Sequence, residues 1–224
     1  MKRRFQCVFG AVVFFLQGSV YAQSITTATD YFRSISEYYA TLMTYEADVD
    51  IRVGSNDLFG HVSFKRPDLL RIDFTNPQGQ VILYNGDLLT IYLPETAAVL
   101  QQQVQGDNAG STLATPQGLS LMSRYYTVAY ETGQHAVTVP DIPDEQIISL
   151  MLYNRSAAES FRSIKLAVGV DSKLIRRVEA RTVGGDVFVF LFSNYVLNNV
   201  ITDQRFIYDP PSSANNYNNF LFSE

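Results

Sequence analysis

The sequence has few of the residues that metal and redox chemistry require. Cys7 is the only cysteine among 224 residues, and His61 and His135 are the only histidines. Because zinc and transition-metal sites are built largely from thiolate and imidazole ligands, a metal centre is poorly supplied. A single cysteine also excludes a disulfide scaffold. We expect neither a metal ion nor a cofactor.

The motifs of common catalytic folds are missing as well. The chain has no G-x-S-x-G elbow, no G-x-G-x-x-G fingerprint, no phosphate-binding loop and no H-E-x-x-H pair. Asp144 and Glu145 are adjacent in the sequence, and Asp48 and Asp50 share one face of a predicted strand. Either pair is a candidate for general acid/base catalysis. A solvated loop and a solvated sheet face explain them more simply. We therefore expect a binding protein rather than an enzyme.

Basic residues are also in the minority. The 17 Lys and Arg residues against 22 Asp and Glu residues give a net charge of −5. Nucleic-acid binding depends on clustered cations that neutralise phosphates, so this balance argues against a nucleic-acid partner. After residue 22 no stretch approaches the roughly 18 apolar residues of a membrane-spanning helix.

The N-terminus has the order of a secretory signal peptide. Lys2-Arg3-Arg4 precedes an apolar stretch from Phe5 to Leu16, and Val20-Tyr21-Ala22 supplies a small-residue cleavage site. We expect cleavage after Ala22, export to the periplasm and one mature domain over residues 23–224. Removal of the leader's three basic residues would change the net charge from −5 to −8, and Cys7 would be lost with them.

Apolar spacing predicts a helix at the start of the mature chain and strands after it. Ile25, Ala28, Phe32, Ile35, Tyr39 and Leu42 recur every three or four residues, and Thr27 to Asp30 can form a capping box. From Ala47 to Val53 the period changes to two, which is typical of a strand with one dry face. Further strands are expected over residues 58–64, 69–74, 80–84, 88–93, 98–104, 147–153, 161–170, 174–183 and 187–197.

Turn signals set the order of these strands. Asn85-Gly86 favours a two-residue hairpin, and Asn76-Pro77-Gln78-Gly79 is another turn, so successive strands should be antiparallel neighbours. Between residues 106 and 133 a weak helical stripe after Pro116 predicts one or two short helices, and the Asn-rich tail over residues 212–219 should be irregular. The expected fold class is mainly β (α+β), with a curved antiparallel sheet of about nine to eleven strands.

One face of this sheet is expected to be apolar. Leu70, Ile72 and Phe74 alternate with Arg71 and Asp73, so the three apolar residues should point to the concave side if the charged ones stay in water. The concave face should also include Leu89, Ile91 and Leu93, and Val187, Val189 and Leu191 or their neighbours. Periodicity does not distinguish a filled core from a ligand cavity on this face.

A family resemblance favours a ligand cavity over a filled core. The run from Phe64 to Phe74, FKRPDLLRIDF, followed by Pro77, Asn85-Gly86 and Tyr92-Leu93-Pro94, resembles the LolA family of periplasmic lipoprotein carriers. The resemblance implies an open β-barrel with a helical lid, which shelters the acyl chains of outer-membrane lipoproteins. The implied ligand-binding residues are Phe64, Leu70, Ile72, Phe74, Leu89 and Ile91 on the sheet, Phe32 and Ile35 on the first helix, and Leu119, Leu121 and Met122 in the lid.

The resemblance also implies a lock at Arg66. Family members use an arginine at this position to hydrogen-bond lid carbonyls while the cavity is empty, and the five donors of a guanidinium suit that task. Two segments depart from the family pattern. Residues 111–118 are polar and contain Pro116, so the geometry of the lid is expected to differ from that of the family. The Asn-rich end over residues 215–222 is also unlike the family, so the transfer of cargo to an acceptor is expected to differ as well.

The implied partners are acylated lipoproteins, an inner-membrane lipoprotein-releasing transporter and an outer-membrane acceptor, with a monomer as the default state. The alternative with the same half-barrel is a periplasmic lipid-binding or lipid-sensing protein. An outer-membrane β-barrel is a third possibility, prompted by the strand count and by Phe220 and Phe222. Pro67, Pro77 and Pro94 between short strands argue against it.

Overall fold

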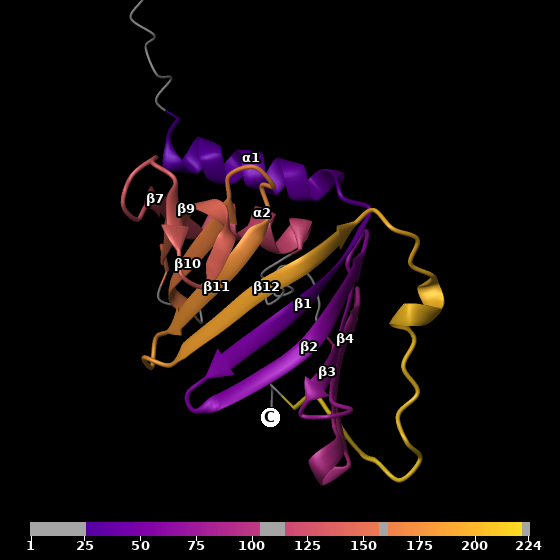
Figure 1. The fold of residues 1–224 in the computed structure, drawn as a ribbon. Coiled ribbons are helices and arrows are strands. Elements are labelled where there is room, and N and C mark those ends of the chain that lie inside the picture. The colour runs from indigo at the N-terminus through magenta and orange to yellow at the C-terminus, as the bar shows by residue number, and fades with distance from the viewer. Residues whose placement is uncertain (1–25, 104–114, 157–160, 221–224) are drawn as a thin grey trace, which may run out of the picture.

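The computed structural model describes residues 26–103, 115–156 and 161–220, which form a strongly curved sheet with two helices against its concave side (Figure 1). Helix α1 spans Ala28–Thr41 and α2 spans Pro116–Tyr125. Two short 3-10 helices, η1 (Pro94–Thr96) and η3 (Asp203–Phe206), lie in connections. The strands are β1 (Thr44–Val53), β2 (Asn56–Lys65), β3 (Leu69–Asn76), β4 (Val81–Asn85), β5 (Leu88–Leu93), β6 (Ala98–Gln103), β7 (Tyr126–Tyr130), β8 (Val137–Val139), β9 (Ile142–Asn154), β10 (Phe161–Gly169), β11 (Ile175–Thr182), β12 (Val187–Leu197) and β13 (Asn215–Asn218).

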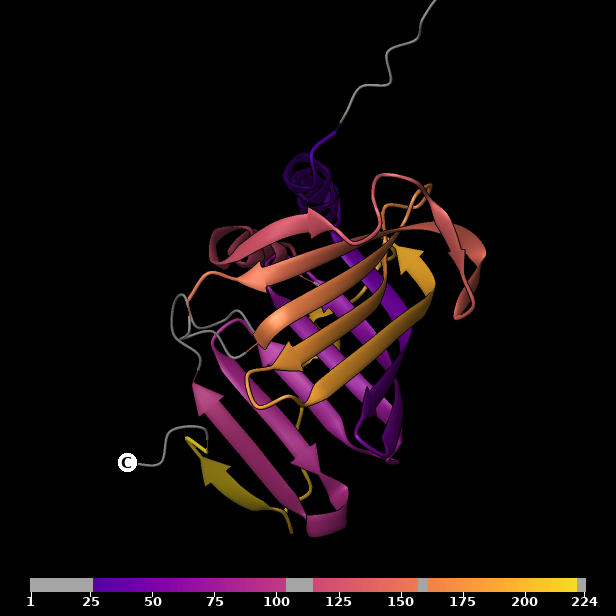
Figure 2. The same ribbon diagram turned by 90° about the vertical axis from the view of Figure 1, so that its left-hand side faces the viewer.

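The sheet is one continuous ladder that does not close on itself. Its order is β13-β6-β5-β4-β3-β2-β1-β12-β11-β10-β9-β7, and β8 pairs with β9 beside this path. Every pairing is antiparallel except that of β13 with β6. Figure 2 shows the two halves of the ladder facing each other like an open trough. The predicted mainly β class with a curved, incomplete barrel is confirmed.

Helix α1 begins where the sequence predicted a cap. The Thr27 hydroxyl accepts a hydrogen bond from Asp30 N at 3.1 Å and donates to the Asp30 carboxylate at 2.7 Å. A capped first turn with an early carboxylate is favourable because it satisfies a free N–H group and complements the helix dipole. The predicted apolar stripe lies against the sheet, with Phe32, Ile35 and Tyr39 at most 1% exposed. Ile25, also part of that stripe, lies outside the described residues.

Ten predicted strands are present, and three further strands were missed. Strand β7 follows α2 directly, within a segment that was predicted to be helical. The predicted irregular tail also contains β13, whose four residues are all exposed and pair through their backbone with β6. Strand β8 has only three residues, too few to show a period of two. The sheet therefore has thirteen strands rather than the expected nine to eleven.

The convex face of β2 to β4 carries a cover that the sequence did not predict. Residues 199–208, here called the C-terminal strap, run outside the sheet beside β3 and β4 (Figure 1). Ile201 and Phe206 of the strap form a small apolar cluster with Val81 and Leu83. Tyr208 of the strap packs near Tyr92, with ring centroids 5.9 Å apart.

The strap corrects the expectation that Arg71 and Asp73 lie in water. Their side chains are only 15% and 32% exposed. Arg71 pairs with Asp73 at 2.7 Å and donates to the carbonyl of Arg205 at 3.0 Å, while Arg205 reaches Asp73 at 2.5 Å. Lys65 adds hydrogen bonds to the Ile201 carbonyl and to a strap carboxylate. The charges do point away from the concave face, but a distant segment covers them.

Candidate functional site: the concave apolar face

The strand register places uncharged side chains along the whole concave face. On β1 the inward residues alternate from Tyr45 to Val53, while Glu46, Asp48 and Asp50 point outward. The same alternation continues through neighbouring strands, because residues paired in register share a face. The large core cluster contains inward residues from β1, β2, β3, β4, β9, β10, β11 and β12. The face is therefore suited to apolar contacts.

The helices fill one part of this face completely. Phe32 and Ile35 of α1, Leu119 and Met122 of α2, and Phe64 of β2 are at most 3% exposed. All five belong to the same core cluster. The structure thus brings together five of the predicted site residues, but as close-packed core rather than as an exposed lining.

Buried tyrosines fix the end of α1 to the sheet. The Tyr39 hydroxyl accepts a hydrogen bond from Ile175 N at 2.9 Å, and the Tyr195 hydroxyl donates to the Ile175 carbonyl at 2.8 Å. Tyr45 lies between Tyr39 and Phe64, with ring centroids 6.2 and 5.0 Å away. Burial raises the pKa of Tyr39 to about 12, so this hydroxyl stays protonated at physiological pH. Apart from the apolar spacing of Tyr39, no sequence pattern predicted this cluster.

Away from the helices the face is incompletely covered. Ile72, Ile82, Ile91 and Leu100 are consecutive partners across β3, β4, β5 and β6. All four are only half-buried, whereas Val62, the next partner on β2, is buried. We call these four residues the open stripe. It is a contiguous row of apolar side chains on the concave side that no described element covers completely.

The opposite wall of the trough contributes aromatic side chains. Phe188 and Phe190 of β12 are paired with Val53 and Ile51 and are half-buried against the core cluster. The expectation that Val187, Val189 and Leu191 "or their neighbours" lie inside is thus resolved in favour of the neighbours. The run VFVFLF is apolar in both registers, so its inward face depends on the pairing with β1.

The remaining predicted site residues take different positions. Leu70 and Phe74 are buried in the core cluster, and Leu89 is half-buried against it. Ile72 and Ile91 belong to the open stripe. Leu121 of α2 is half-buried and is not part of the core cluster. The predicted residues therefore divide into a packed set and a partly accessible set.

Arg66 lies just after β2, close to the end of α1. Its backbone N donates to the Met43 carbonyl at 2.9 Å, and its guanidinium lies 3.9 Å from the Met43 sulfur. The side chain is exposed, and within the described part of the chain it makes no hydrogen bond to a carbonyl of α2. The lock therefore stays a prediction.

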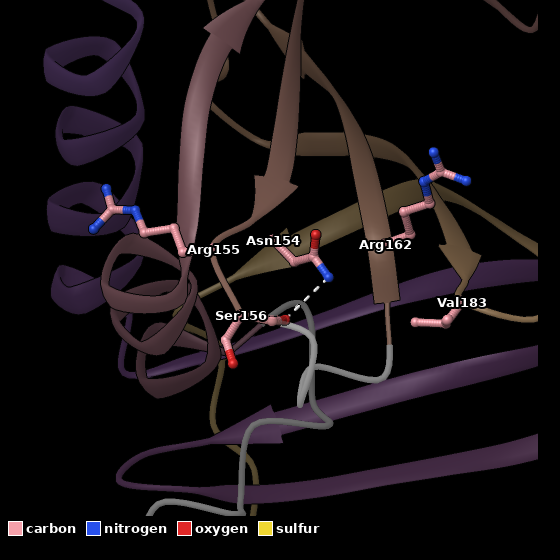
Figure 3. Close-up of a pocket in the computed structure, with 5 residues that line it drawn as sticks. All are labelled: Asn154, Arg155, Ser156, Arg162 and Val183. Atoms are coloured by element: carbon pink, nitrogen blue, oxygen red, sulfur yellow. Dashed lines mark hydrogen bonds between the residues drawn. The ribbon is translucent and has the colours of Figure 1, made fainter.

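A polar pocket opens at one end of the trough. It has a volume of about 360 Å³ and is lined by Asn154, Arg155, Ser156, Arg162 and Val183. Figure 3 shows the two arginines on opposite sides of Asn154 and Ser156, with their guanidinium groups pointing apart. The Asn154 side chain donates to the Ser156 carbonyl at 3.1 Å. None of these residues was predicted as a site residue.

Three of the four acidic residues considered for catalysis, Asp144, Glu145 and Asp48, are held in ion pairs and hydrogen bonds. Arg176 binds Glu145 at 2.8 Å and Asp144 at 3.1 Å. Asp48 binds His61 at 2.9 Å on the outward face, where a hydrogen bond from Asn194 and one from His61 hold the pKa of Asp48 below its ordinary range.

The described residues hold neither a metal-binding cluster nor a membrane-spanning helix. They contain no cluster of three side chains able to hold a metal ion. No described helix is both long and apolar enough to cross a bilayer.

Solved structures share this fold at low identity. An uncharacterized conserved protein from Thermus thermophilus is 16% identical, with a TM-score of 0.55 over 84% of this chain and 96% of the other. The lipoprotein LppX of Mycobacterium tuberculosis is 12% identical, with a TM-score of 0.50 over 78% and 97%. A chain of the Pseudomonas aeruginosa MucA/MucB complex is 10% identical, with a TM-score of 0.50 over 81% and 61%.

Comparison at the sequence level identifies the family. Among curated proteins none matches this chain significantly. A sequence profile described as outer membrane lipoprotein carrier protein LolA, however, matches residues 54–209. This match spans most of the sheet, from the β1–β2 turn to the end of the strap, and so includes both walls of the trough. The chain belongs to the LolA family of outer membrane lipoprotein carrier proteins.

Proposed function

We propose that this protein is a periplasmic carrier that binds the acyl chains of lipoproteins on its concave face and moves them from the inner to the outer membrane. Family membership implies an exported protein that binds lipid or lipoprotein, rather than an enzyme. The observation that carries the finer proposal is the open stripe, an accessible apolar row that continues the apolar core cluster along the concave face.

The physical need for such a surface is large. Each methylene moved out of water contributes about 0.8 kcal/mol, so several acyl chains are strongly disfavoured in an aqueous compartment. A carrier must shield these chains from water and must still be able to release them. A half-buried apolar row can do both, because ligand binding removes its remaining exposed surface, and no covalent step or cofactor is required.

The proposal also includes a route. The predicted signal peptide, residues 1–22, would deliver the mature chain to the periplasm, and these residues lie outside the described part of the structure. Cargo would come from an inner-membrane lipoprotein-releasing transporter and pass to an outer-membrane acceptor. We propose that the carrier acts as a monomer.

A pair of matched variants tests the binding surface. Ile72→Asp places a charge in the open stripe, whereas Val189→Asp places the same charge on the outward face of β12, where Val189 is also half-buried. Purified protein would be mixed with a triacylated lipoprotein and with its non-acylated form. We expect wild type and Val189→Asp to retain only the acylated form, and Ile72→Asp to lose at least tenfold in affinity, because a buried unpaired charge is costly. Equal binding by both variants would contradict the proposed surface.

The lock at Arg66 is a separate part of the proposal. We expect Arg66→Leu still to bind cargo but to release it to an acceptor more slowly, because loss of the guanidinium removes the competing closed state of the empty protein. Arg33→Leu is a suitable control, since Arg33 is also exposed and on α1 pairs only with Asp30. Wild-type capture and discharge rates in Arg66→Leu would count against the lock.

A further inference from the structure

We propose that Tyr217 of β13 contacts the acyl chains of the cargo, so that the binding surface extends beyond the open stripe by one strand. The inference rests on the proposed function and adds a ligand-binding residue to it. The register of β13, its composition and its backbone hydrogen bonds support this role.

The open stripe continues onto β13. Tyr217 is the register partner of Leu100, the last member of the stripe. The other members of the stripe connect Leu100 to Val62, which belongs to the core cluster. Because register partners share a face of the sheet, Tyr217 lies on the concave face. Figure 2 shows β13, in yellow, as the outermost strand of this wall.

Tyr217 is the one residue of β13 with a large apolar part. The strand reads Asn-Asn-Tyr-Asn, and all four side chains are exposed. Asn216 is the partner of Val99, a buried residue whose register partners on β5 and β4 belong to or pack against the apolar cluster of the convex face. A shift of β13 by one residue would therefore put the ring on the convex face and an asparagine beside Leu100.

Backbone hydrogen bonds at both ends of β13 fix this register. Asn215 N donates to the Ala97 carbonyl at 2.8 Å. Asn219 N donates to the Gln101 carbonyl, also at 2.8 Å. Asn219 follows the strand with a φ of 57°, a left-handed conformation that asparagine adopts more readily than most residues. The position of Tyr217 is thus set by the main chain, and its side chain is left 53% exposed.

An exposed ring beside an apolar row is suited to cover a chain that lies on that row. Contact with an acyl chain would remove water from the ring, which is favourable because apolar surface leaves water on both partners. The tyrosine hydroxyl can stay hydrated at the edge of the sheet while the ring packs against methylenes. Tyr217 therefore fits the place where the acyl site ends and the polar part of the cargo returns to water.

A tryptophan reporter tests the contact directly, because the chain contains no tryptophan. Tyr217→Trp would be titrated with a synthetic triacylated lipopeptide, and with the same lipopeptide carrying brominated chains, which quench tryptophan emission at close range. We expect the first ligand to shift the emission to shorter wavelength and the second to quench it. Tyr153→Trp is the control, because Tyr153 is 49% exposed but alternates with the buried Leu152 and so lies on the convex face. Its emission should change with neither ligand.

An exchange of two neighbours tests whether the contact contributes to affinity. The double variant Asn216→Tyr, Tyr217→Asn keeps the composition of β13 and moves the ring to the convex face. We expect it to bind the triacylated lipopeptide about threefold to tenfold more weakly than wild type, and Tyr217→Phe to stay within about twofold, because the ring rather than the hydroxyl covers the chain. Urea unfolding should give the same midpoint for all three proteins, since these side chains are exposed.

The outcomes separate this inference from the proposed function. Binding of the lipopeptide by wild type, measured by calorimetry, without a response of Tyr217→Trp would overturn the inference and leave acyl binding standing. Equal affinities of wild type and the exchanged double variant would also overturn the inference. If wild type binds neither the lipopeptide nor an acylated lipoprotein, the proposed function and this inference both fail.

Discussion

At the residue scale, Tyr39 is the polar contact that attaches α1 to the sheet. Its ring is fully buried and its hydroxyl accepts the Ile175 N–H. Replacement by Phe keeps the ring but leaves that N–H without its side-chain acceptor. We expect Tyr39→Phe to lower the free energy of unfolding by about 1–2 kcal/mol, measured by urea denaturation.

Tyr38 provides the control for this change. It is the neighbouring residue on the same helix, is half-buried, and its hydroxyl makes no hydrogen bond to another described residue. Tyr38→Phe should leave the unfolding free energy within about 0.5 kcal/mol of wild type. Equal losses in the two variants would show that the hydrogen bond to Ile175 is not what anchors the helix.

Glu145 gives stability a pH dependence. Burial opposes ionisation, but hydrogen bonds from Ser172 and Arg176 prevail and hold the pKa of Glu145 below its ordinary value of 4.5. A carboxylate with a lowered pKa in the folded state stabilises the protein above its unfolded pKa, and this stability is lost as pH falls through the folded pKa. We expect Glu145→Gln to be less stable than wild type by about 1–2 kcal/mol at pH 7.

The pH profile checks this assignment. The difference between wild type and Glu145→Gln should shrink as pH falls below 4.5, because the carboxylate becomes protonated first in the unfolded state and then, at lower pH, in the folded state. Thermal denaturation between pH 3 and pH 7 measures it. A difference that is constant over this range would assign the effect to packing against Gly169, which the Glu145 side chain covers.

At the element scale, the C-terminal strap stabilises the wall formed by β3 and β4. Phe206 is buried against Val81 and Leu83, whereas Ile207, the next residue, is 60% exposed. We expect Phe206→Ala to cost about 3 kcal/mol in urea unfolding and Ile207→Ala less than about 0.5 kcal/mol. Similar small losses in both would mean that the ion pairs around Asp73, rather than apolar burial, hold the strap.

The elements also show which parts of the fold are readable from sequence. Strands β1 and β3 alternate charged and apolar residues, and turns such as Asn85-Gly86 separate the strands that follow, so the approximate bounds of β1 to β6 and the inward direction of Ile72 were predictable. Strand β7 begins at Tyr126 without a turn residue after α2, and β13 has no apolar face. The cover over Arg71 comes from residues more than 130 positions away, and no local pattern encodes such a contact.

Only part of the candidate site was predictable from the sequence. Alternation and family resemblance together identified the inward residues of β3 and β5. They did not distinguish the buried Phe64 from the half-buried Ile72, because that difference depends on where α1 and α2 lie over the sheet.

At the scale of the whole molecule, the fold has a rigid part and a receptive part. The helices and the tyrosine cluster close-pack one region of the concave face, and interiors of that density resist the insertion of a ligand. The open stripe and the phenylalanines of β12 remain half-buried. The proposed function therefore requires that acyl chains bind along the receptive part rather than beneath α1.

The most direct test of this central claim is mass spectrometry of the protein gently purified from the periplasm, with extraction of bound material into organic solvent. A second exported protein that binds no lipid serves as the control. We predict stoichiometric acylated lipoprotein, with phospholipid as a minor species. Phospholipid alone would favour the alternative of a general lipid-binding or lipid-sensing protein. An empty protein that also fails to take up added lipoprotein would contradict the account, because the concave face would then be an ordinary core.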